Sequence, residues 1–474
     1  MNINTICIFV SSQPRQILLP SPSLSLNDKL SLDSSKTHFQ MYPRISGQPF
    51  RRLIVSNAAS SSPSLSGGSS DQYLDVGAQS KEEMEAETEQ DPMNLADPDS
   101  CFCEFQGVNI HHKVFDPQTL SDDVSDTSLD AQKSRKADFP MILLHGFGAS
   151  VFSWNRVMKP LARLVRSKVL AFDRPAFGLT SRIFHPFNGT TNDAKPLNPY
   201  SMVYSVLTTL YFIDFLAAEK AILVGHSAGC LVAVDTYFEA PERVAALILV
   251  APAIFAPRPV VTTNAGDNRG KEAPTSNFLG TIVELTKGVI RAVLRAVTGM
   301  ANMLNSLYKK ALAAFLRSFL GVMLVRMAIN KFGVTAVRNA WYDSKQVTDH
   351  VVQGYTKPLK AKGWDKALVE FTVATITDTN GSDKKPPLSK RLQEIKCPVL
   401  IVTGDTDRIV PAWNAERLSR AIPGSVLEVV KKCGHLPQEE KPDEFTSIVA
   451  KFLGNAFGGP QQEQVDLKFQ GIVS

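Results

Sequence analysis

Short runs of apolar residues alternate with segments of helical spacing along most of the chain. Continuous apolar runs are typical of strands that are buried on both faces of a parallel sheet. The predicted strands cover 139–144, 168–172, 220–224, 244–250, 398–402 and 425–430, after a strand pair over 105–115. The predicted helices cover 154–165, 202–217, 230–238, 412–421 and 443–453. Strands that alternate with helices indicate an α/β fold, in which helices cover both faces of a mostly parallel sheet.

A long insertion interrupts this alternation. We expect a core built from residues 101–252 and 397–458, a helical cap or lid over 253–396, and a tail over 459–474. Within the cap, residues 281–340 carry nine basic residues against one acid. Apolar residues are dense between these charges, a pattern that is typical of a helix on a membrane surface. Two interpretations stay open: a lid that rests on anionic lipid, or a cap that packs on its own core with a solvated basic rim.

The first hundred residues differ in composition from the rest. Residues 1–70 are rich in serine and carry six basic residues against two acids, which is typical of an organelle transit peptide. The segment 54–59 resembles a stromal processing site, so we predict a transit peptide over 1–59 and a chloroplast location. A mitochondrial location and a plain unfolded tail are the alternatives. Residues 71–100 carry ten acids and one lysine, and their mutual repulsion predicts an unfolded acidic linker over 60–100.

Composition and charge exclude several classes of protein. The chain has 474 residues, of which 44% are hydrophobic and 20% are charged, and its formal net charge is +5. A dedicated nucleic-acid-binding protein carries a strongly basic domain, so we expect no nucleic-acid partner. No uncharged stretch of about 18 residues is apolar enough to cross a bilayer, so no transmembrane segment is predicted. The six cysteines have neither the spacing of a disulfide framework nor that of a zinc site.

The first candidate for chemistry is the motif Gly225-His226-Ser227-Ala228-Gly229. It follows a predicted strand and opens a predicted helix, as the G-x-S-x-G nucleophile elbow does. The turn is too tight for side chains at Gly225 and Gly229, and it presents the Ser227 hydroxyl at the end of the strand. We therefore predict that Ser227 is a nucleophile.

A serine nucleophile needs a base, and the base needs an acid that fixes its orientation. Downstream of Ser227 there are two histidines, His350 and His435. His435 follows a predicted strand, whereas His350 lies in the helical insertion, so His435 is the predicted base. Asp407 follows the strand that ends at residue 402 and is the predicted acid. Asp405 is the alternative acid, and it can instead shape the turn.

Backbone N–H groups must stabilise the oxyanion that develops on the substrate. One predicted donor is Ala228, directly after the nucleophile. The other is Phe147, in the loop His145-Gly146-Phe147-Gly148 that follows the strand ending at residue 144. Gly146 and Gly148 let the backbone of this loop approach the substrate. His145 is interpreted as a residue that organises the loop rather than as a base.

These motifs together resemble the α/β-hydrolase superfamily, and in particular its serine hydrolases with an HG-x-G oxyanion loop. The similarity extends over about residues 105–455 and includes the motif at 173–178, where Ala176 occupies a position that is usually glycine. It implies an eight-stranded, mostly parallel sheet with a cap insertion. It also implies that Asp173 is structural and that no metal or organic cofactor is needed. With its leader, the chain looks like a plant plastid member of the superfamily.

The predicted function is a serine hydrolase that cleaves a hydrophobic, lipid-like or prenyl-type carboxylic ester through an acyl-enzyme. Three alternatives stay open: hydrolysis of a C–C bond, acyl transfer by the same triad, or a receptor or scaffold that turns over slowly. The predicted partners are a small hydrophobic ester and, through the basic cap, the surface of a membrane.

Overall fold

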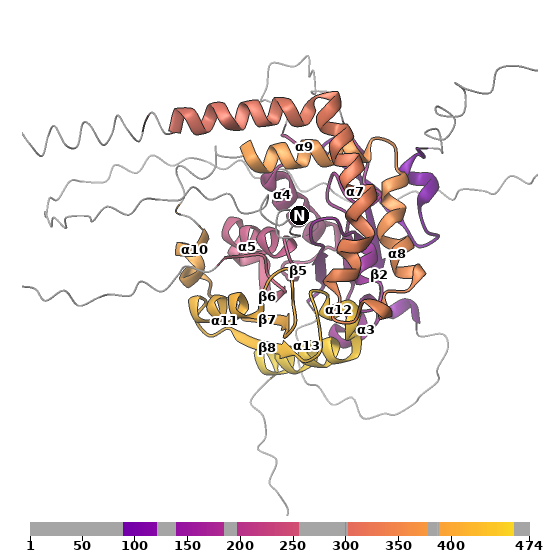
Figure 1. Cartoon of the computed structure of the whole chain (residues 1–474). Coiled ribbons are helices and arrows are strands. Elements are labelled where there is room, and N and C mark those ends of the chain that lie inside the picture. The colour runs from indigo at the N-terminus through magenta and orange to yellow at the C-terminus, as the bar shows by residue number, and fades with distance from the viewer. Residues whose placement is uncertain are drawn as a thin grey trace, which may run out of the picture. The chain divides into compact units, whose positions relative to one another are not determined.

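One sheet carries the strands that precede and follow the insertion (Figure 1). The computed structural model describes residues 89–120, 139–183, 197–255, 302–377 and 388–458, with the single residues 299 and 386. Its strands are β1 (Cys101–Phe105), β2 (Val108–Phe115), β3 (Met141–Leu144), β4 (Val169–Phe172), β5 (Ala221–His226), β6 (Val244–Val250), β7 (Val399–Gly404) and β8 (Val426–Val430). The described strands lie in the order β1-β2-β4-β3-β5-β6-β7-β8.

Only the β1–β2 and β2–β4 pairs of this sheet are antiparallel. The five remaining pairs, from β4–β3 to β7–β8, are parallel. The predicted mostly parallel eight-stranded sheet is therefore confirmed for the described residues. Every residue of β3 to β7 is buried, whereas β1 and β8 at the two edges are partly exposed. This explains why the inner strands are continuous apolar runs, because neither of their faces meets water.

Helices cover both faces of the sheet. The first layer contains α4 (Met202–Phe215), α5 (Gly229–Glu239) and α11 (Ala412–Ala421), and the second contains α3 (Met158–Val165) and α13 (Pro442–Phe457). Successive side chains of a strand point to opposite faces. In β3, Ile142 therefore packs in the cluster that includes Phe212 of α4, and Leu143 packs in the cluster that includes Phe445 of α13.

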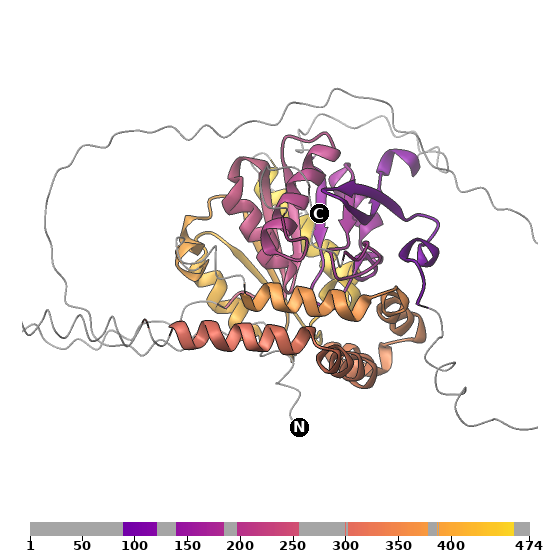
Figure 2. The same cartoon turned by 90° about the horizontal axis from the view of Figure 1, so that it is seen from above.

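The described part of the insertion between β6 and β7 is mostly helical. It contains α7 (Phe319–Ala340), α8 (Asp349–Thr356), α9 (Trp364–Thr377) and α10 (Leu388–Arg391), and residues 302–317 before α7 are also helical. In both views the helix through 302–317 lies beside α9 (Figures 1 and 2). The chain turns at Ser318, whose side chain caps α7 by accepting a hydrogen bond from the Gly321 N–H.

The insertion packs over the ends of the strands. Trp364 and Leu368 of α9 share a cluster with Ala176 and Phe177, which follow the carboxyl end of β4. Trp341, directly after α7, shares another with Leu436, which follows β8. The cap therefore lies over the edge of the sheet where the candidate motifs are found.

Single-turn elements connect these parts of the fold. They are η2 (Pro92–Leu95), η3 (Pro117–Leu120), η4 (Val151–Trp154), η5 (Pro241–Arg243), η6 (Ser344–Gln346), η7 (Lys357–Lys360), η8 (Leu392–Glu394) and the short helix α12 (Pro437–Glu440). The hairpin between β1 and β2 turns at Gln106 and Gly107, both of which have positive φ. Such φ values suit the tight turn of a two-residue hairpin.

The acidic segment corrects one prediction. Residues 89–100 were assigned to an unfolded linker, but the structure packs them against the core and the cap. Gln90 forms a β-bridge with Ala361, and the Asp97 carboxylate bonds to the ammonium groups of Lys113 and Lys357. The acids here have basic partners on both the core and the cap, so their mutual repulsion does not decide the conformation. The predicted transit peptide, the tail and residues 60–88 of the predicted linker lie outside the described residues.

Candidate active site

Ser227 lies in the turn between β5 and α5 with φ at +51°. This left-handed conformation is unfavourable for a residue with a β-carbon, so the surroundings must hold it in place. The Ser227 N–H donates to the Val250 carbonyl of β6 at 2.8 Å, and the Ser227 carbonyl accepts from the N–H groups of Cys230 and Ala253. The backbone of the candidate nucleophile is thus fixed from three sides.

The glycines around Ser227 are required by space. A β-carbon at Gly229 would collide with the Leu144 carbonyl oxygen of β3, and one at Gly225 would lie 2.7 Å from the Cys230 backbone. A β-carbon at Gly146 would lie 3.0 Å from Ser227 Cβ. The predicted oxyanion loop therefore lies directly against the candidate nucleophile.

His435 and Asp407 are brought together as the sequence predicted. His435 Nδ1 lies 2.7 Å from Asp407 Oδ2, and both side chains are buried. The other carboxylate oxygen, Oδ1, accepts from the N–H groups of Ile409 and Val410 at 2.8 and 2.9 Å. With both its oxygens engaged, the carboxylate is held in one orientation. It therefore fixes the tautomer of His435 that leaves Nε2 free to accept a proton.

Asp405, the alternative acid, has a different environment. Its side chain is exposed, and Oδ1 accepts from the Thr406 hydroxyl at 2.8 Å and from the Cys433 N–H at 3.4 Å. Burial by itself raises the pKa of this carboxyl, but the hydrogen bonds from Thr406 and the neighbouring backbone together outweigh it and lower the pKa. Asp405 therefore shapes the turn after β7. His350, the alternative base, is exposed on α8, with its ring 5.5 Å from that of Phe152.

Three contacts hold the loop that carries His435. The His435 N–H donates to the Ala340 carbonyl at the end of α7, at 2.7 Å. The His435 carbonyl lies 3.0 Å from His226 Nε2, and the two imidazole rings are 4.8 Å apart. Glu440 Oε1 accepts from the N–H groups of Gly434 and Leu436, on either side of His435. The candidate base is thus tied to the elbow through His226 and to the cap through Ala340.

His226 is the residue next to the nucleophile, and its imidazole is fully enclosed. Burial keeps the pKa of His226 well below its ordinary value, and the neighbouring His435 adds to this effect. A neutral His226 can donate from Nε2 to the His435 carbonyl. The His226 ring therefore connects the backbone next to Ser227 to the loop of the candidate base. The Ser227 hydroxyl itself makes no hydrogen bond to another residue in the described part of the chain. The bond between nucleophile and base is often formed only when substrate is bound.

One predicted oxyanion donor, Ala228, directly follows Ser227, and the other, Phe147, directly follows Gly146, which packs against Ser227. Neither the Phe147 N–H nor the Ala228 N–H donates a hydrogen bond to another described residue. Ala228 is the residue directly before α5, so its N–H is at the positive end of the helix dipole. Gly148, with φ at +72°, lets the chain turn after Phe147. These two amides can therefore bind an oxyanion.

His145 is engaged through both ring nitrogens. Nδ1 lies 2.8 Å from the Gly146 carbonyl, and Nε2 accepts from the Arg174 N–H at 3.0 Å. Burial lowers the pKa of His145 to about 4. A neutral imidazole with both nitrogens bonded to backbone connects the oxyanion loop to the turn after β4, in agreement with a role in organising the loop.

Aromatic rings from the core and the cap surround this loop. Phe147 contacts Phe177 of the core and Phe371 of α9, with ring centroids 5.5 and 6.1 Å apart. The guanidinium of Arg174 lies over the Phe371 ring at 5.3 Å. Two of its nitrogens, Nε and Nη1, are buried with no partner among the described residues, and burial lowers the pKa of Arg174 to about 10. The wall next to the candidate site therefore combines apolar rings with an uncompensated cation.

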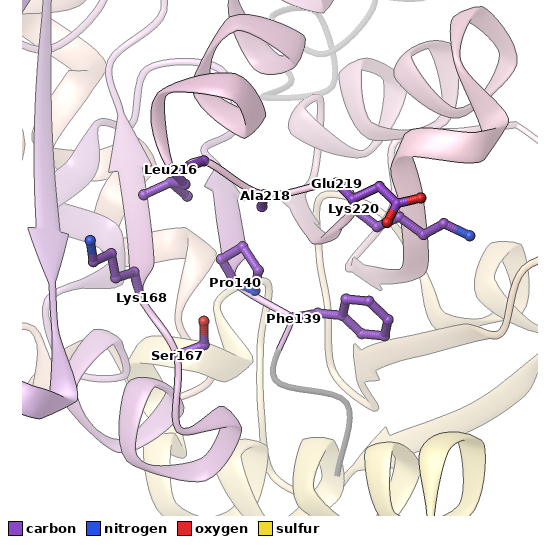
Figure 3. A pocket seen from close by; sticks show the side chains of 9 residues that line it. Phe139, Pro140, Ser167, Lys168, Leu216, Ala218, Glu219 and Lys220 are labelled. Atoms are coloured by element: carbon purple, nitrogen blue, oxygen red, sulfur yellow. The ribbon is translucent and has the colours of Figure 1, made fainter. Parts of the chain in front are cut away.

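A surface hollow is found at the other edge of the sheet, where the parallel strands begin (Figure 3). It is lined by Phe139, Pro140, Ser167, Lys168, Leu216, Ala217, Ala218, Glu219 and Lys220. None of the predicted catalytic residues lines it. No group of three or more His, Cys, Asp or Glu side chains in the described ranges is arranged to hold a metal ion.

Comparison with known proteins agrees with this geometry. A family model described as the alpha/beta hydrolase family matches residues 141–448, which is more than half of the chain. The chain belongs to the alpha/beta hydrolase family. This hydrolase is 25% identical over 313 residues to the uncharacterized hydrolase YugF of Bacillus subtilis (strain 168), covering 66% of this chain and 89% of the relative.

A second relative of the hydrolase is named for its activity. The 2-hydroxy-6-oxononadienedioate/2-hydroxy-6-oxononatrienedioate hydrolase of Comamonas testosteroni is 24% identical over 322 residues, covering 66% of this chain and 87% of the relative. Among solved structures, a hydrolase from Pseudomonas aeruginosa PA01 matches 76% of this chain and 100% of its own, with 16% identity and a TM-score of 0.47.

Four residues near the site of this alpha/beta hydrolase are not among those predicted from the sequence. His226, Arg174, Glu440 and Phe371 each contact a predicted site residue or its loop. His226 lies inside the elbow motif and Arg174 inside the motif at 173–178, so the sequence already pointed to the neighbourhood of both residues. Glu440 and Phe371 lie on helices whose spacing gives no sign of a contact with the site.

Proposed function

We propose that this hydrolase uses Ser227 as a nucleophile, His435 as its general base and Asp407 as the acid that orients His435. The observation that carries the proposal is the 2.7 Å bond between His435 Nδ1 and Asp407 Oδ2 in a loop tied to the strained elbow of Ser227. Strain at a residue with a β-carbon persists only when the surrounding structure enforces it, and such residues cluster at active sites.

The reaction has two halves. His435 accepts the Ser227 hydroxyl proton while Ser227 Oγ attacks the substrate carbonyl, and the Phe147 and Ala228 amides stabilise the oxyanion. The protonated His435, stabilised by Asp407, then gives its proton to the leaving group, and an acyl-enzyme remains. In the second half His435 takes a proton from water, which attacks the acyl carbonyl. His435 then returns this proton to Ser227 Oγ as the acid is released.

Two kinds of scissile bond fit this sequence of steps. In ester hydrolysis the leaving group is an alkoxide, which needs only a proton. In C–C hydrolysis it is a carbanion, which also needs conjugation in the substrate to spread its charge. Several relatives are named for C–C substrates, which are 2-hydroxy-6-oxo dienoates and dienedioates. Their names favour C–C hydrolysis as the activity of this chain, with a hydrophobic carboxylic ester as the second candidate.

Arg174 gives a physical reason to expect an anionic substrate. A buried guanidinium without a partner is costly, and a carboxylate that binds it in two places removes that cost. The guanidinium lies over the rings of Phe177 and Phe371, and both rings contact Phe147 of the oxyanion loop. We propose that it receives a carboxylate of the substrate, a group that the named dienoates carry and a neutral ester lacks.

Product analysis separates these activities. We expect the full chain to cleave a 2-hydroxy-6-oxo-dienoate to two acids with a larger kcat/KM than it cleaves a neutral p-nitrophenyl ester. Arg174→Gln should raise KM about ten- to a hundredfold for the dienoate and leave the ester unchanged. If the ester is cleaved faster than the dienoate, and if the KM for the dienoate is unchanged in Arg174→Gln, the chain is an esterase instead. Ester products with an added alcohol would show acyl transfer, and binding without turnover would show a receptor.

A further inference from the structure

Apolar side chains are exposed on one part of the cap, and we call them the apolar cap face. It consists of Met303, Leu304, Leu307, Tyr308, Phe315, Phe319, Leu320, Met323, Leu324, Met327 and Phe332. Phe319 is 86% exposed and Met327 is 55% exposed. These residues lie on the helix through 302–317 and on α7, which follow one another in the chain (Figure 2). A continuous exposed apolar surface on a folded domain marks an interaction site.

Five exposed apolar side chains in the first half of α7, from Phe319 to Met327, share one side of the helix. Phe319, Met323 and Met327 are spaced by four residues, which places them on one face. Val325 and Ile329 face the other way and pack against the cluster that contains Trp364 of α9. A helix on the surface of a soluble protein normally turns polar residues to water. Between Phe319 and Met327, by contrast, the outward face of α7 is apolar.

The charge around this face has one sign. Residues 285–342 contain no aspartate or glutamate. Arg317 is paired with Glu370 of α9, and Arg326 is paired with Asp365. Lys309, Lys310 and Lys331, by contrast, have no carboxylate partner within the described part of the chain. Unpaired ammonium groups next to exposed apolar side chains complement an anionic lipid headgroup above an acyl layer.

α7 is long enough to cross a bilayer, with a mean hydropathy of 1.4 over an apolar window that is 6% buried. No other described helix meets this test. Its contacts favour a position along the membrane surface. The Ala340 carbonyl at its end accepts the His435 N–H, and Arg326 in its middle bonds to Asp365 and Glu89. Crossing the bilayer would break these bonds and place Arg326 in hydrocarbon, which is costly.

We propose that the apolar cap face docks on the surface of a membrane that contains anionic lipid, with α7 lying in the interface. The inner side of the same cap contacts Phe147 of the oxyanion loop through Phe371. Docking therefore places the cap between the candidate site and the lipid layer. Together with the proposed function, on which this step rests, it assigns the substrate to amphiphilic carboxylates that partition into membranes. The docking itself does not depend on the catalytic assignment.

Vesicle sedimentation of the full chain tests the docking. We expect strong binding to vesicles of phosphatidylcholine with phosphatidylglycerol, and weaker binding to phosphatidylcholine alone. The triple variant Phe319→Ser, Met323→Ser, Met327→Ser should lose at least about tenfold in binding to both. The matched control is Met93→Ser on η2, where the methionine is 59% exposed, and it should bind as the wild type does.

Variants of Lys309 and Lys310 test the electrostatic part of the proposed docking. Lys309→Gln with Lys310→Gln should lower binding to the anionic vesicles about 25-fold, at about fivefold for each lysine, and leave binding to neutral vesicles unchanged. Lys159→Gln with Arg163→Gln on α3 is the control with the same change of charge. Unchanged binding in the triple variant, or no vesicle binding at all, would overturn the proposal. Resistance to carbonate extraction would show a membrane-spanning helix, and a dimer that the triple variant disperses would show a second copy on this face.

Discussion

At the scale of single residues, Ser227 must be distinguished from Ser100, a second serine with a histidine and an aspartate nearby. Ser100 Oγ lies 2.9 Å from His111 Nε2, and His111 Nδ1 lies 2.6 Å from Asp173 Oδ2, so Ser100 also belongs to a Ser–His–Asp chain. Asp173 additionally accepts the Val151 and Leu179 N–H groups. Ser100 directly precedes β1, so the serine of this chain lies on neither the oxyanion loop nor the elbow. Side-chain hydrogen bonds alone therefore do not identify the nucleophile.

Asp173 agrees with the structural role that the resemblance implied. The carboxylate is buried, which by itself raises the pKa, but the bonded His111 outweighs burial and lowers the pKa of Asp173 to about 2. The same turn contains Ala176 with φ at +81°, in the left-handed region. This explains why glycine is usual at that position, because glycine adopts such a φ without steric cost.

The two aspartates after β7 give a matched pair of variants. Asp407→Asn should lower kcat on the order of 10⁴-fold, because an amide donates where a carboxylate accepts and so favours the wrong tautomer of His435. Asp405→Asn should leave kcat nearly unchanged, since Asp405 is exposed and bonds to Thr406 and the Cys433 N–H rather than to the His435 ring. Steady-state kinetics on the same substrate measure both. Equal losses in the two variants would contradict the assignment of the acid.

At the scale of elements, the contact between the end of α7 and the loop of His435 decides the position of the base. A β-carbon at Gly434 would lie 2.7 Å from the Tyr342 N and collide with the Ala340 carbonyl. Gly434→Ala should therefore destabilise the protein by about 1–3 kcal/mol and lower kcat, because it displaces the loop. The control is Gly454→Ala in α13, where a β-carbon has open space. It should stabilise by about 0.5–1 kcal/mol. Urea unfolding gives both free energies. If Gly434→Ala has the stability of the wild type, the contact between the end of α7 and the loop of His435 does not fix the position of that loop.

The contact between α8 and α12 predicts a dependence of stability on pH. Glu439 is buried, which raises its pKa to about 8, and its carboxyl accepts a hydrogen bond from the Tyr355 hydroxyl at 2.5 Å. Because the pKa is higher in the folded state than in the unfolded chain, the folded state binds the proton more tightly. The stabilisation is complete below about pH 4.5 and is lost as the pH rises towards 8.

Glu439→Gln removes this titration and keeps an acceptor for Tyr355. The unfolding temperature of the wild type should therefore fall more between pH 5 and pH 8 than that of Glu439→Gln. Glu416→Gln on α11 removes an exposed carboxylate and should follow the wild type. Parallel pH profiles of wild type and Glu439→Gln would contradict a protonated Glu439.

At the scale of the whole molecule, the place of the candidate site could be predicted from the sequence because a general rule for parallel sheets applies. The carboxyl ends of parallel strands meet at one edge of a sheet, so motifs after β3, β5 and β7 had to meet near Ser227. The bond between Asp407 and His435 could be expected for that reason. The packing of residues 89–100 could not, because it depends on Lys113 and Lys357, which are distant in sequence.

The exposure of α7 shows a second limit of sequence patterns. The spacing of apolar residues predicts the helix. However, this spacing is the same for an apolar helix that is buried in a core and for one that is exposed on a surface. Only the packing of α9 against one side of α7 shows which of its apolar residues remain outside. The same holds for Arg174, whose lack of a partner is a property of the folded chain.

The central claim is that Ser227, and no other serine, attacks the substrate. Treatment of the full chain with a fluorophosphonate, followed by mass spectrometry of the peptides, tests it most directly. We predict one adduct, on Ser227, which is lost in Ser227→Ala and retained in Ser100→Ala, the matched control from the second Ser–His–Asp chain. An adduct that persists in Ser227→Ala, or one found on Ser100, would contradict the account.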